Sequence, residues 1–455
     1  MSEVTQSSLP ISEHQQVFCE LVEVALQEAK KLGASDAAAE ISESRGLSVS
    51  VRKQKPETVE QARERSLGVS VYAGQRRGTA STSDFSLAAI RETVAAAWHI
   101  ARFTAEDPAA GLPADEDLAF DYPDLALYRP WMLDAEQAAH WAQRAEQAAL
   151  SYDADITNSE GASVDSLEGH FVLGNSRGFL GGYPYSRHSI SVSPIAGRGA
   201  EMQRDYWYSV ARAMHRLDSP EEVGRIAAQR TLSRLHARSV PTGRYPVIFE
   251  APLAAGLIGA FVRANSGGAL YRGASFLQGA LGERIFPEHV QLLERPHLKG
   301  GLGSAPFDGE GVATHSRVVI QQGELQGHFL SSYTARKLGL KTTGNADGAH
   351  NLLLRSQRTQ PHHSLDALLK EMGTGLLVTE LIGQGINFVT GDYSRGAFGY
   401  WVENGQIQYP VQGITIAGNL RDMFRQIALV GHDRLVRGGR ETGSILIEEM
   451  AIAGH

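Results

Sequence analysis

The chain has 455 residues, of which 42% are hydrophobic and 21% are charged, and its formal net charge is −8. This is the composition of a globular protein with two or three domains, and its negative charge argues against bulk attraction to nucleic acid or to an anionic membrane. The sequence has no secretory signal pattern at its N-terminus and no apolar run of roughly 18 residues that could span a membrane. We therefore expect a cytoplasmic location.

The first expected element is a helix over residues 15–33, where apolar positions recur with helical spacing until Gly33 ends the pattern. It contains Cys19, the only cysteine of the chain. A single thiol excludes an internal disulfide and any metal site built from several thiolates. We interpret Cys19 as a small hydrophobic residue on the buried side of this helix.

Further along the first half, strands and helices are both predicted. Alternating or helical periodicity indicates strands near 47–51, 58–66, 68–73 and 189–196, and helices over 87–103, 135–150 and 219–237. Asp134 is a good N-cap for the helix over 135–150. Residues 104–131 have no clear period and predict a long loop. The tetrapeptides NSEG (158–161) and NSRG (175–178) each predict a tight turn between strands.

A boundary between two domains is predicted at SVPTGRYPV (239–247), where two prolines and a glycine precede an apolar run. Beyond it, residues 318–330 and 398–411 read as hairpins, the second with the strong turn signal Asn404-Gly405. A last strand is expected over 443–454. We predict an α+β protein with mixed or antiparallel sheets and flanking helices, divided into an N-terminal domain (1–238) and a β-rich C-terminal domain (239–455).

The residues that usually perform catalysis are scarce. A zinc-protease helix needs two histidines one turn apart with a carboxylate between them, and no His-Glu pair occurs in this sequence. His350, His362 and His363 lie with Asp347 in a polar stretch that reads as a loop, although a metal site built from them stays an alternative. Gly174–Gly178 matches G-x-S-x-G but lacks the helix that a nucleophile elbow requires, so a hairpin is favoured.

The glycine-rich run from Gly391 to Leu420 has one acidic residue, an arginine and several aromatic residues. Such a run suits a site that holds another polypeptide better than an acid/base centre, because exposed strand edges with glycine-rich approaches can accept an extended peptide. Asp392, Tyr393, Ser394 and Arg395 are the candidates for contacting a substrate or partner. A well-bonded turn of the scaffold is the alternative interpretation.

Residues 379–420, with SAPFDGEGVAT (304–314) and GSILIEEMAIAG (443–454), resemble the PmbA (TldE) branch of the TldD/PmbA family. The resemblance implies a two-domain α+β protein that pairs with a TldD-type subunit as a heterodimeric metallopeptidase acting on unfolded proteins and peptides. It also implies links to peptide-antibiotic maturation, antitoxin turnover and the older label modulator of DNA gyrase.

In the TldD branch, the resemblance implies a zinc site made of a helical His-Glu-x-x-x-His motif and a cysteine near the C-terminus. Aligned through GLIGAF, those positions fall here on Glu250, Ala251 and Ala255, with the thiolate position near Thr442. Alanine side chains cannot bind a metal, and a single carboxylate is not a catalytic zinc site. We therefore expect no cofactor in this chain, and zinc only in the partner.

Three hypotheses follow. The first is a non-catalytic subunit that completes a peptidase with a TldD-type partner, and that forms a homodimer in isolation. The second is a stand-alone binding or regulatory protein linked to toxin–antitoxin systems of DNA gyrase. The third is a cryptic metallopeptidase that uses ligands such as His350, His362 and His363.

Overall fold

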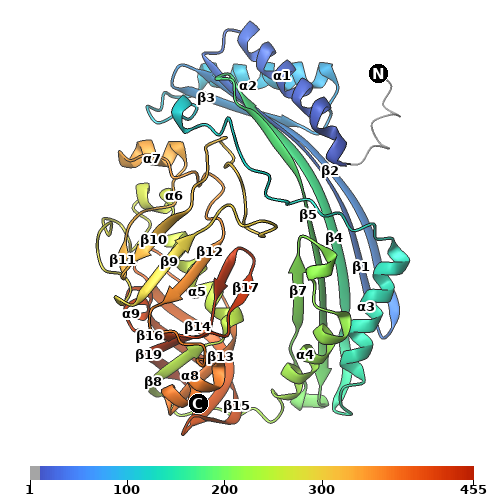
Figure 1. Cartoon of the computed structure of the whole chain (residues 1–455), viewed down its shortest axis with the longest axis vertical. Helices are drawn as coiled ribbons and strands as arrows, with labels where there is room; N and C mark the ends of the chain where they lie inside the picture. Colours follow the sequence, from blue (N-terminus) through green and yellow to red (C-terminus); the bar gives the residue numbers. More distant parts are fainter. Residues whose placement is uncertain (1–10, 455) are drawn as a thin grey trace.

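The computed structural model describes residues 11–454, which form three β-sheets with flanking helices (Figure 1). This arrangement confirms the predicted α+β class. Every strand of one sheet precedes residue 239 and every strand of the other two follows it. The connection between these parts runs from the end of helix α4 (Pro220–Leu232) to strand β8 (Gly243–Phe249). We call the two parts the N-terminal and C-terminal halves.

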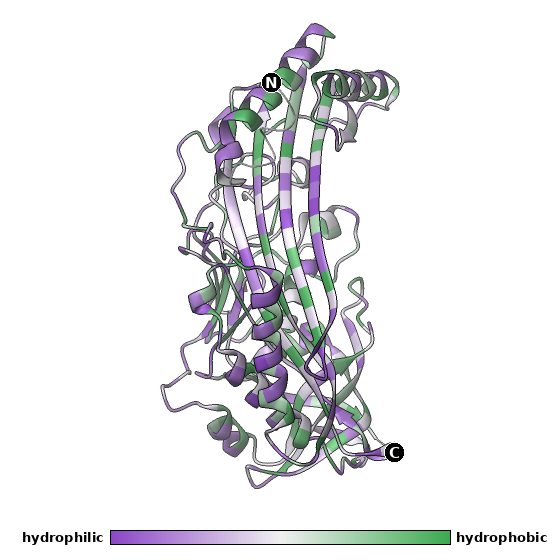
Figure 2. Ribbon diagram, turned by 90° about the vertical axis from the view of Figure 1, so that its right-hand side faces the viewer, coloured by the Kyte–Doolittle hydropathy of each residue, from purple (hydrophilic) through white to green (hydrophobic). Residues whose placement is uncertain are grey.

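The N-terminal half is built on one long antiparallel sheet in the order β3-β2-β1-β4-β5-β6, with β7 also paired to β5. The strands are β1 (Asp36–Arg52), β2 (Lys55–Ala73), β3 (Arg76–Thr82), β4 (Ile156–Asn175), β5 (Leu180–Ala196), β6 (Gln203–Arg204) and β7 (Trp207–Ala211). Hydrophobic and hydrophilic residues alternate along them (Figure 2), as expected for a sheet that buries one face.

Four helices cover the apolar face of this sheet in two separate groups. Helices α1 (Gln15–Lys31) and α2 (Leu87–Phe103) pack on one end, around Ile41 and Val71. Helices α3 (Ala135–Leu150) and α4 pack on the other end, around Val49 and Ile190. The opposite face carries no helix and is turned toward the C-terminal half (Figure 1).

The C-terminal half contains two sheets, in the orders β11-β10-β9-β12-β18-β17 and β15-β14-β13-β8-β19-β16. Its strands after β8 are β9 (Val290–Glu294), β10 (Arg317–Gln321), β11 (Glu324–Leu325), β12 (Leu352–Ser356), β13 (Gly375–Ile382), β14 (Asp392–Glu403), β15 (Gln406–Asn419), β16 (Ile427–Val430), β17 (Leu435–Arg437), β18 (Arg440–Thr442) and β19 (Ile445–Ala453). Its helices are α5 (Ala251–Ala264), α6 (Gly267–Tyr271), α7 (Ser332–Leu338), α8 (Leu365–Met372) and α9 (Leu420–Arg425). The apolar α5 lies in the main core between the sheets.

The two halves touch near both ends of the long sheet. After α2, Asp107 accepts a hydrogen bond from Lys337 Nζ of α7 at 2.8 Å, and the Arg336 guanidinium donates to the backbone carbonyls of Ala109, Gly111 and Leu112. At the other end, α4 reaches the start of α5. The long sheet is therefore fixed to the C-terminal half at two distant places.

Several predicted details differ from the structure. The buried face of α1 consists of Phe18, Val22, Ala25 and Ala29, so Cys19 lies beside this stripe and is only partly buried. Burial nevertheless raises the pKa of its thiol. Helix α4 ends at Leu232, five residues before the predicted end, and residues 104–131 form the expected loop with one short 3-10 turn at Asp115–Asp117.

The prediction of a turn at NSEG (158–161) was wrong. These residues lie inside β4, which pairs with β5 through register shifts at Ile156/Asn158 and Ser159/Gly161. A polar, glycine-containing tetrapeptide suits a β-bulge as well as a turn, and the long pairing of β4 with its neighbours decides for the bulge. NSRG (175–178), by contrast, contains the predicted turn between β4 and β5.

The Asn404-Gly405 turn joins β14 to β15 as predicted, and both residues have positive φ, 52° and 72°. We expect Gly405→Ala to lower the free energy of unfolding by about 2 kcal/mol, because a new Cβ would lie 2.7 Å from the Cα of Lys370 in a strained conformation. Gly178→Ala is the control, since Gly178 has positive φ but no atom within 4 Å of the added Cβ. If urea unfolding shows that Gly405→Ala and Gly178→Ala lower the free energy of unfolding equally, the close approach to Lys370 has no effect.

Candidate functional site

The positions where the resemblance implies a metal site lie at the start of α5. Glu250 follows β8 and is the N-cap residue of α5, while Ala251 and Ala255 are buried within its first turns. Thr442, at the end of β18, is fully buried. Ser444, two residues beyond it, accepts a hydrogen bond at 3.0 Å from the backbone N–H of Ala251. The fold therefore brings the C-terminal segment to α5, and Glu250 is the one ionisable residue of the four positions.

The Glu250 carboxylate binds an arginine of the N-terminal half. Arg230 of α4 donates from Nη1 to Glu250 Oε1 at 2.7 Å, and its Nε lies 3.4 Å from Asp205 Oδ2. Burial alone would lower the pKa of Arg230, but the two carboxylates outweigh it and raise this pKa above its ordinary value. A guanidinium therefore neutralises the one acid that remains at the implied metal position.

Further ion pairs and aromatic rings surround this pair. Arg234 lies between Asp205 and Glu380 and has its guanidinium 3.7 Å from the Phe398 ring centroid. The Tyr400 hydroxyl is 2.5 Å from that of Ser233. These contacts join α4 and the residues directly after it to β13 and β14 of the C-terminal half. The cluster combines two arginines and three carboxylates with aromatic packing, and it holds the two halves together.

Metal binding does not fit this donor set. Alanine offers no ligand atom at two of the positions, and the Glu250 carboxylate is already paired with Arg230. Across residues 11–454, no three His, Cys, Asp or Glu side chains gather in a group that could hold a metal ion.

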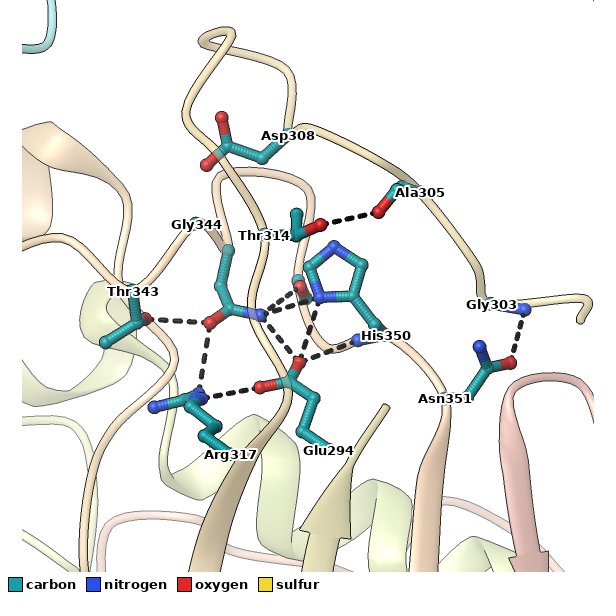
Figure 3. A network of polar contacts seen from close by, with 12 residues as sticks. Glu294, Gly303, Ala305, Asp308, Thr314, Arg317, Thr343, Gly344, His350 and Asn351 are labelled. Atoms are coloured by element: carbon teal, nitrogen blue, oxygen red, sulfur yellow. Dashed lines mark hydrogen bonds and ion pairs between the residues drawn. The ribbon is translucent and has the colours of Figure 1, made fainter. Parts of the chain in front are cut away.

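The histidine alternative is not supported by the arrangement. His350 is buried, and its Nδ1 lies 3.0 Å from Glu294 Oε1 (Figure 3). His362 and His363 stack edge to face, 4.5 Å apart, in the loop before α8. The three histidines do not form a metal-binding group with each other or with Asp347 in the described part of the chain.

Glu294 is the centre of a buried polar network. It accepts hydrogen bonds from Arg317 Nε at 2.6 Å and from the backbone of His350 at 2.9 Å (Figure 3). It also accepts one from Asn345 Nδ2 at 2.8 Å. Burial opposes ionisation, but the bonds from His350 and the charge of Arg317 lower the pKa of Glu294 to about 2. Because an ionised carboxylate can only accept, the proton of His350 must lie on Nδ1.

The four candidate residues of β14 do not share one surface. Asp392 and Ser394 are exposed, whereas Tyr393 is 2% exposed and packs in the main core. Burial raises the pKa of Tyr393 to about 12. Asp392 accepts from Thr390 Oγ1 at 2.6 Å, and Arg395 is partly buried. Alternation along the strand thus leaves Asp392 and Ser394 as the residues best placed to contact another molecule.

The helix-free face of the long sheet carries many short polar side chains, together with the larger Leu167, Phe171, Leu173, Tyr183 and Tyr185. Register places the following on it: Ser42, Ser44, Ser48, Ser50, Ser66, Ser70, Thr79, Ser81, Ser163, Ser189 and Ser191. A hollow of about 500 Å³ opens between this face and Gly309 and Glu310 of the C-terminal half. Glu40 also lines the hollow, and the surrounding protein raises the pKa of its carboxyl, helped by the charge of Asp347.

Reasoning from the sequence missed Arg230, Asp205 and the Glu294 network. In the sequence, Arg230 is one of several polar residues on an amphipathic helix. No local pattern shows that its side chain binds a residue of the C-terminal half. Glu294 ends a short strand and carries no motif. Their roles depend on contacts between segments far apart in the chain.

Comparison with known proteins agrees with this architecture. Three family profiles match, for the PmbA/TldA metallopeptidase domain 1 (37–101), central domain (128–235) and C-terminal domain (242–454). The chain belongs to the PmbA/TldD metallopeptidase family. It is 49% identical to the metalloprotease PmbA of Escherichia coli O157:H7 over 98% of both chains. It is also 46% identical to a PmbA homologue of Haemophilus influenzae over 100% of both.

Solved structures share the fold over nearly the whole chain. A candidate modulator of DNA gyrase from Bacteroides thetaiotaomicron superposes with a TM-score of 0.89 at 27% identity, covering 96% of this chain and 98% of that one. TldE from Thermococcus kodakarensis superposes with a TM-score of 0.83 at 20% identity, covering 95% and 100%. No helix within residues 11–454 has both the length and the apolar character needed to cross a membrane.

Proposed function

We propose that this chain is a non-catalytic subunit of a PmbA/TldD-type peptidase, in which a TldD-type partner carries the zinc and this chain helps to hold an extended peptide. The observation that carries the proposal is the Arg230–Glu250 ion pair at the implied metal position. A buried guanidinium bound to the sole remaining acid repels a divalent cation. The chain keeps the scaffold of its family but not a set of metal ligands.

The polar face of the long sheet supports the peptide-holding part of this proposal. Serine hydroxyls both donate and accept hydrogen bonds, so they suit polar backbone groups of any sequence. The hollow beside them, with Glu40 and Glu310 on its walls, is large enough for a few residues of extended chain. Side chains of this kind give little selectivity for apolar groups, which fits unfolded substrates of varied sequence.

Reconstitution tests the proposal. We expect the purified chain alone to leave an unfolded, fluorescently labelled polypeptide intact, and a mixture with a TldD-type subunit from the same organism to cleave it. The partner alone and the chain alone are the controls, each with and without a chelator. Chelator-sensitive cleavage by the chain alone, or equal cleavage by the partner with and without the chain, would contradict the proposal.

The regulatory hypothesis makes a different prediction for the same preparation. A stand-alone protein linked to DNA gyrase would bind gyrase or an antitoxin in the absence of any TldD-type subunit. Affinity capture from a lysate, followed by mass spectrometry, separates the two functions. We expect a TldD-type subunit to be the main captured protein, and capture of gyrase or antitoxin alone would favour the regulatory hypothesis.

A further inference from the structure

Strands β17 and β18 form a short hairpin with an arginine on each side of its turn. Arg437 and Arg440 are paired directly across the two-residue turn Gly438-Gly439. Residues directly opposite each other in an antiparallel pair project from the same face, so both guanidinium groups leave the hairpin on one side. The hairpin extends from the C-terminal half toward β7, an edge strand of the long sheet (Figure 1).

Arg437 reaches the N-terminal half through two aromatic rings. Its guanidinium carbon lies 4.1 Å from the ring centroid of Tyr208 and 4.5 Å from that of Trp207. Tyr208 is paired with Ser191, so register places it on the helix-free face beside the serine side chains. Arg437 Nη1 also donates a long hydrogen bond, 3.5 Å, to the Tyr208 carbonyl oxygen. These contacts orient the guanidinium beside the helix-free face but do not neutralise its charge.

Arg440 lies against α5 of the C-terminal half. A Cβ added to Gly259 would stand 3.0 Å from Arg440 Nη1 and 3.4 Å from Nη2, so the guanidinium packs directly on this glycine. Gly259 follows Ala255 by four residues and therefore lies one turn further along the same side of the helix. The Arg440 side chain is thus one helical turn from an implied metal position.

The two guanidinium groups lack a counter-charge. Within residues 11–454, no carboxylate forms an ion pair with either of them, and burial lowers the pKa of both. Arg212 also has no carboxylate partner, but it donates to three backbone carbonyls at 3.0–3.1 Å. The Arg440 guanidinium has no hydrogen bond to any described residue. Because arginine keeps its charge at neutral pH, two partly buried cations remain here for an anion to bind.

We propose that Arg437 and Arg440 form a binding site for a carboxylate of the peptide that this chain holds, either its C-terminal carboxylate or that of an acidic side chain. The identity of the ligand as a peptide rests on the proposed function. Directly opposite Cα atoms lie about 4.5–5.5 Å apart, so both long side chains start close enough to contact one carboxylate. A guanidinium can donate two parallel N–H groups to the two carboxylate oxygens, which makes this anion a good geometric match.

The overall charge of the chain opposes such binding. With a net charge of −8, the protein as a whole repels an anionic peptide. A preference for peptides that carry a carboxylate must therefore come from a local cationic site, and its loss on substitution can be assigned to particular residues.

Peptide binding to the purified chain alone tests the proposal. The probes are serine- and glycine-rich peptides with an uncharged fluorophore at the N-terminus. One pair differs only in a free or an amidated C-terminus, and a second, amidated pair differs only in an internal aspartate or asparagine. Fluorescence anisotropy should show a Kd about tenfold lower for the carboxylate member of at least one pair. We call this ratio the carboxylate preference. The pair that shows it identifies the source of the carboxylate, and equal Kd values within both pairs would overturn the proposal.

Substitutions assign the preference to the two arginines. Arg437→Gln and Arg440→Gln should each reduce the carboxylate preference to about twofold or less, in variants whose circular dichroism matches that of the parent. Arg434→Gln is the matched control, because it removes the same charge directly before β17 from an exposed side chain. Its odd spacing from Arg437 places it on the other face of an extended strand. A preference that survives both Arg437→Gln and Arg440→Gln, or that Arg434→Gln abolishes equally, would overturn the proposal.

The result can be separated from that of the reconstitution experiment. If the reconstituted pair cleaves the polypeptide but this chain shows no carboxylate preference, the carboxylate site is wrong and the proposed function stands. If the preference is present and depends on Arg437 and Arg440 but no cleavage occurs, the site stands and the proposed function is wrong.

Discussion

Arg230→Ala is expected to lower the free energy of unfolding by about 3 kcal/mol, because it leaves the largely buried carboxylate of Glu250 without its cation and leaves Asp205 with Arg234 alone. The side chains of Arg230 and Glu250 are both only 17% exposed, so solvent can replace little of the lost interaction. The midpoint of urea unfolding, followed by circular dichroism, measures the effect. Loss of the Arg230–Glu250 ion pair should also weaken the contact between α4 and α5 that joins the two halves.

A matched control lies on the same helix. Arg225 forms an ion pair with Glu222 at 2.7 Å, but both side chains are more than 40% exposed. Exposed pairs contribute roughly 0–1 kcal/mol, so Arg225→Ala should change the midpoint little. If Arg225→Ala and Arg230→Ala destabilise the protein equally, the Arg230–Glu250 pair has no special role in holding the halves together.

Glu294→Gln is expected to destabilise the protein by about 3 kcal/mol at neutral pH, since it removes the charge to which Arg317 is bound in a site that is 1% exposed. The effect should depend on pH. The pKa of Glu294 is lowered from an ordinary value near 4.5 to about 2, so the folded state holds the ionised form more strongly than the unfolded state does. This contribution is complete above about pH 4.5 and is lost as the pH falls toward 2.

The measurement is the free energy of unfolding in urea between pH 6 and pH 3. The free energy of unfolding of the parent chain should fall as the pH falls across this range. In Glu294→Gln it should fall less steeply, because the contribution of Glu294 is missing. Glu324→Gln is the control, because Glu324 lies in the same sheet with its side chain 45% exposed beside Arg284. Identical slopes for the parent and Glu294→Gln would contradict the assigned role of the carboxylate.

The features that the sequence predicted correctly are those set by short stretches of neighbouring residues. The helices over 87–103 and 135–150 have the predicted bounds, and the second is fixed by the capping box between Asp134 and Gln137. The Asn404-Gly405 turn was equally readable, because a two-residue hairpin needs positive φ at both positions. Each of these features is decided by residues within a few positions of one another.

Features that depend on distant segments could not be read in this way. The region predicted as separate strands over 58–66 and 68–73 is one strand, β2, because pairing with β1 along its whole length overrides the local interruption. Glu250 was identified through the family resemblance, but its partner Arg230 lies in the other half of the fold. Tyr393 looked available in a glycine-rich run, yet the packing of β14 on the core buries it.

The double attachment of the long sheet has a mechanical consequence. The Asp107–Lys337 contact fixes one end and the Arg230–Glu250 contact fixes the other, so neither end can act as a hinge while the opposite end stays closed. Two attachments at opposite ends of the sheet oppose a hinge motion of one half against the other. For the proposed function, this means that a polypeptide would enter the helix-free face from the flank, without a swinging motion of the subunit.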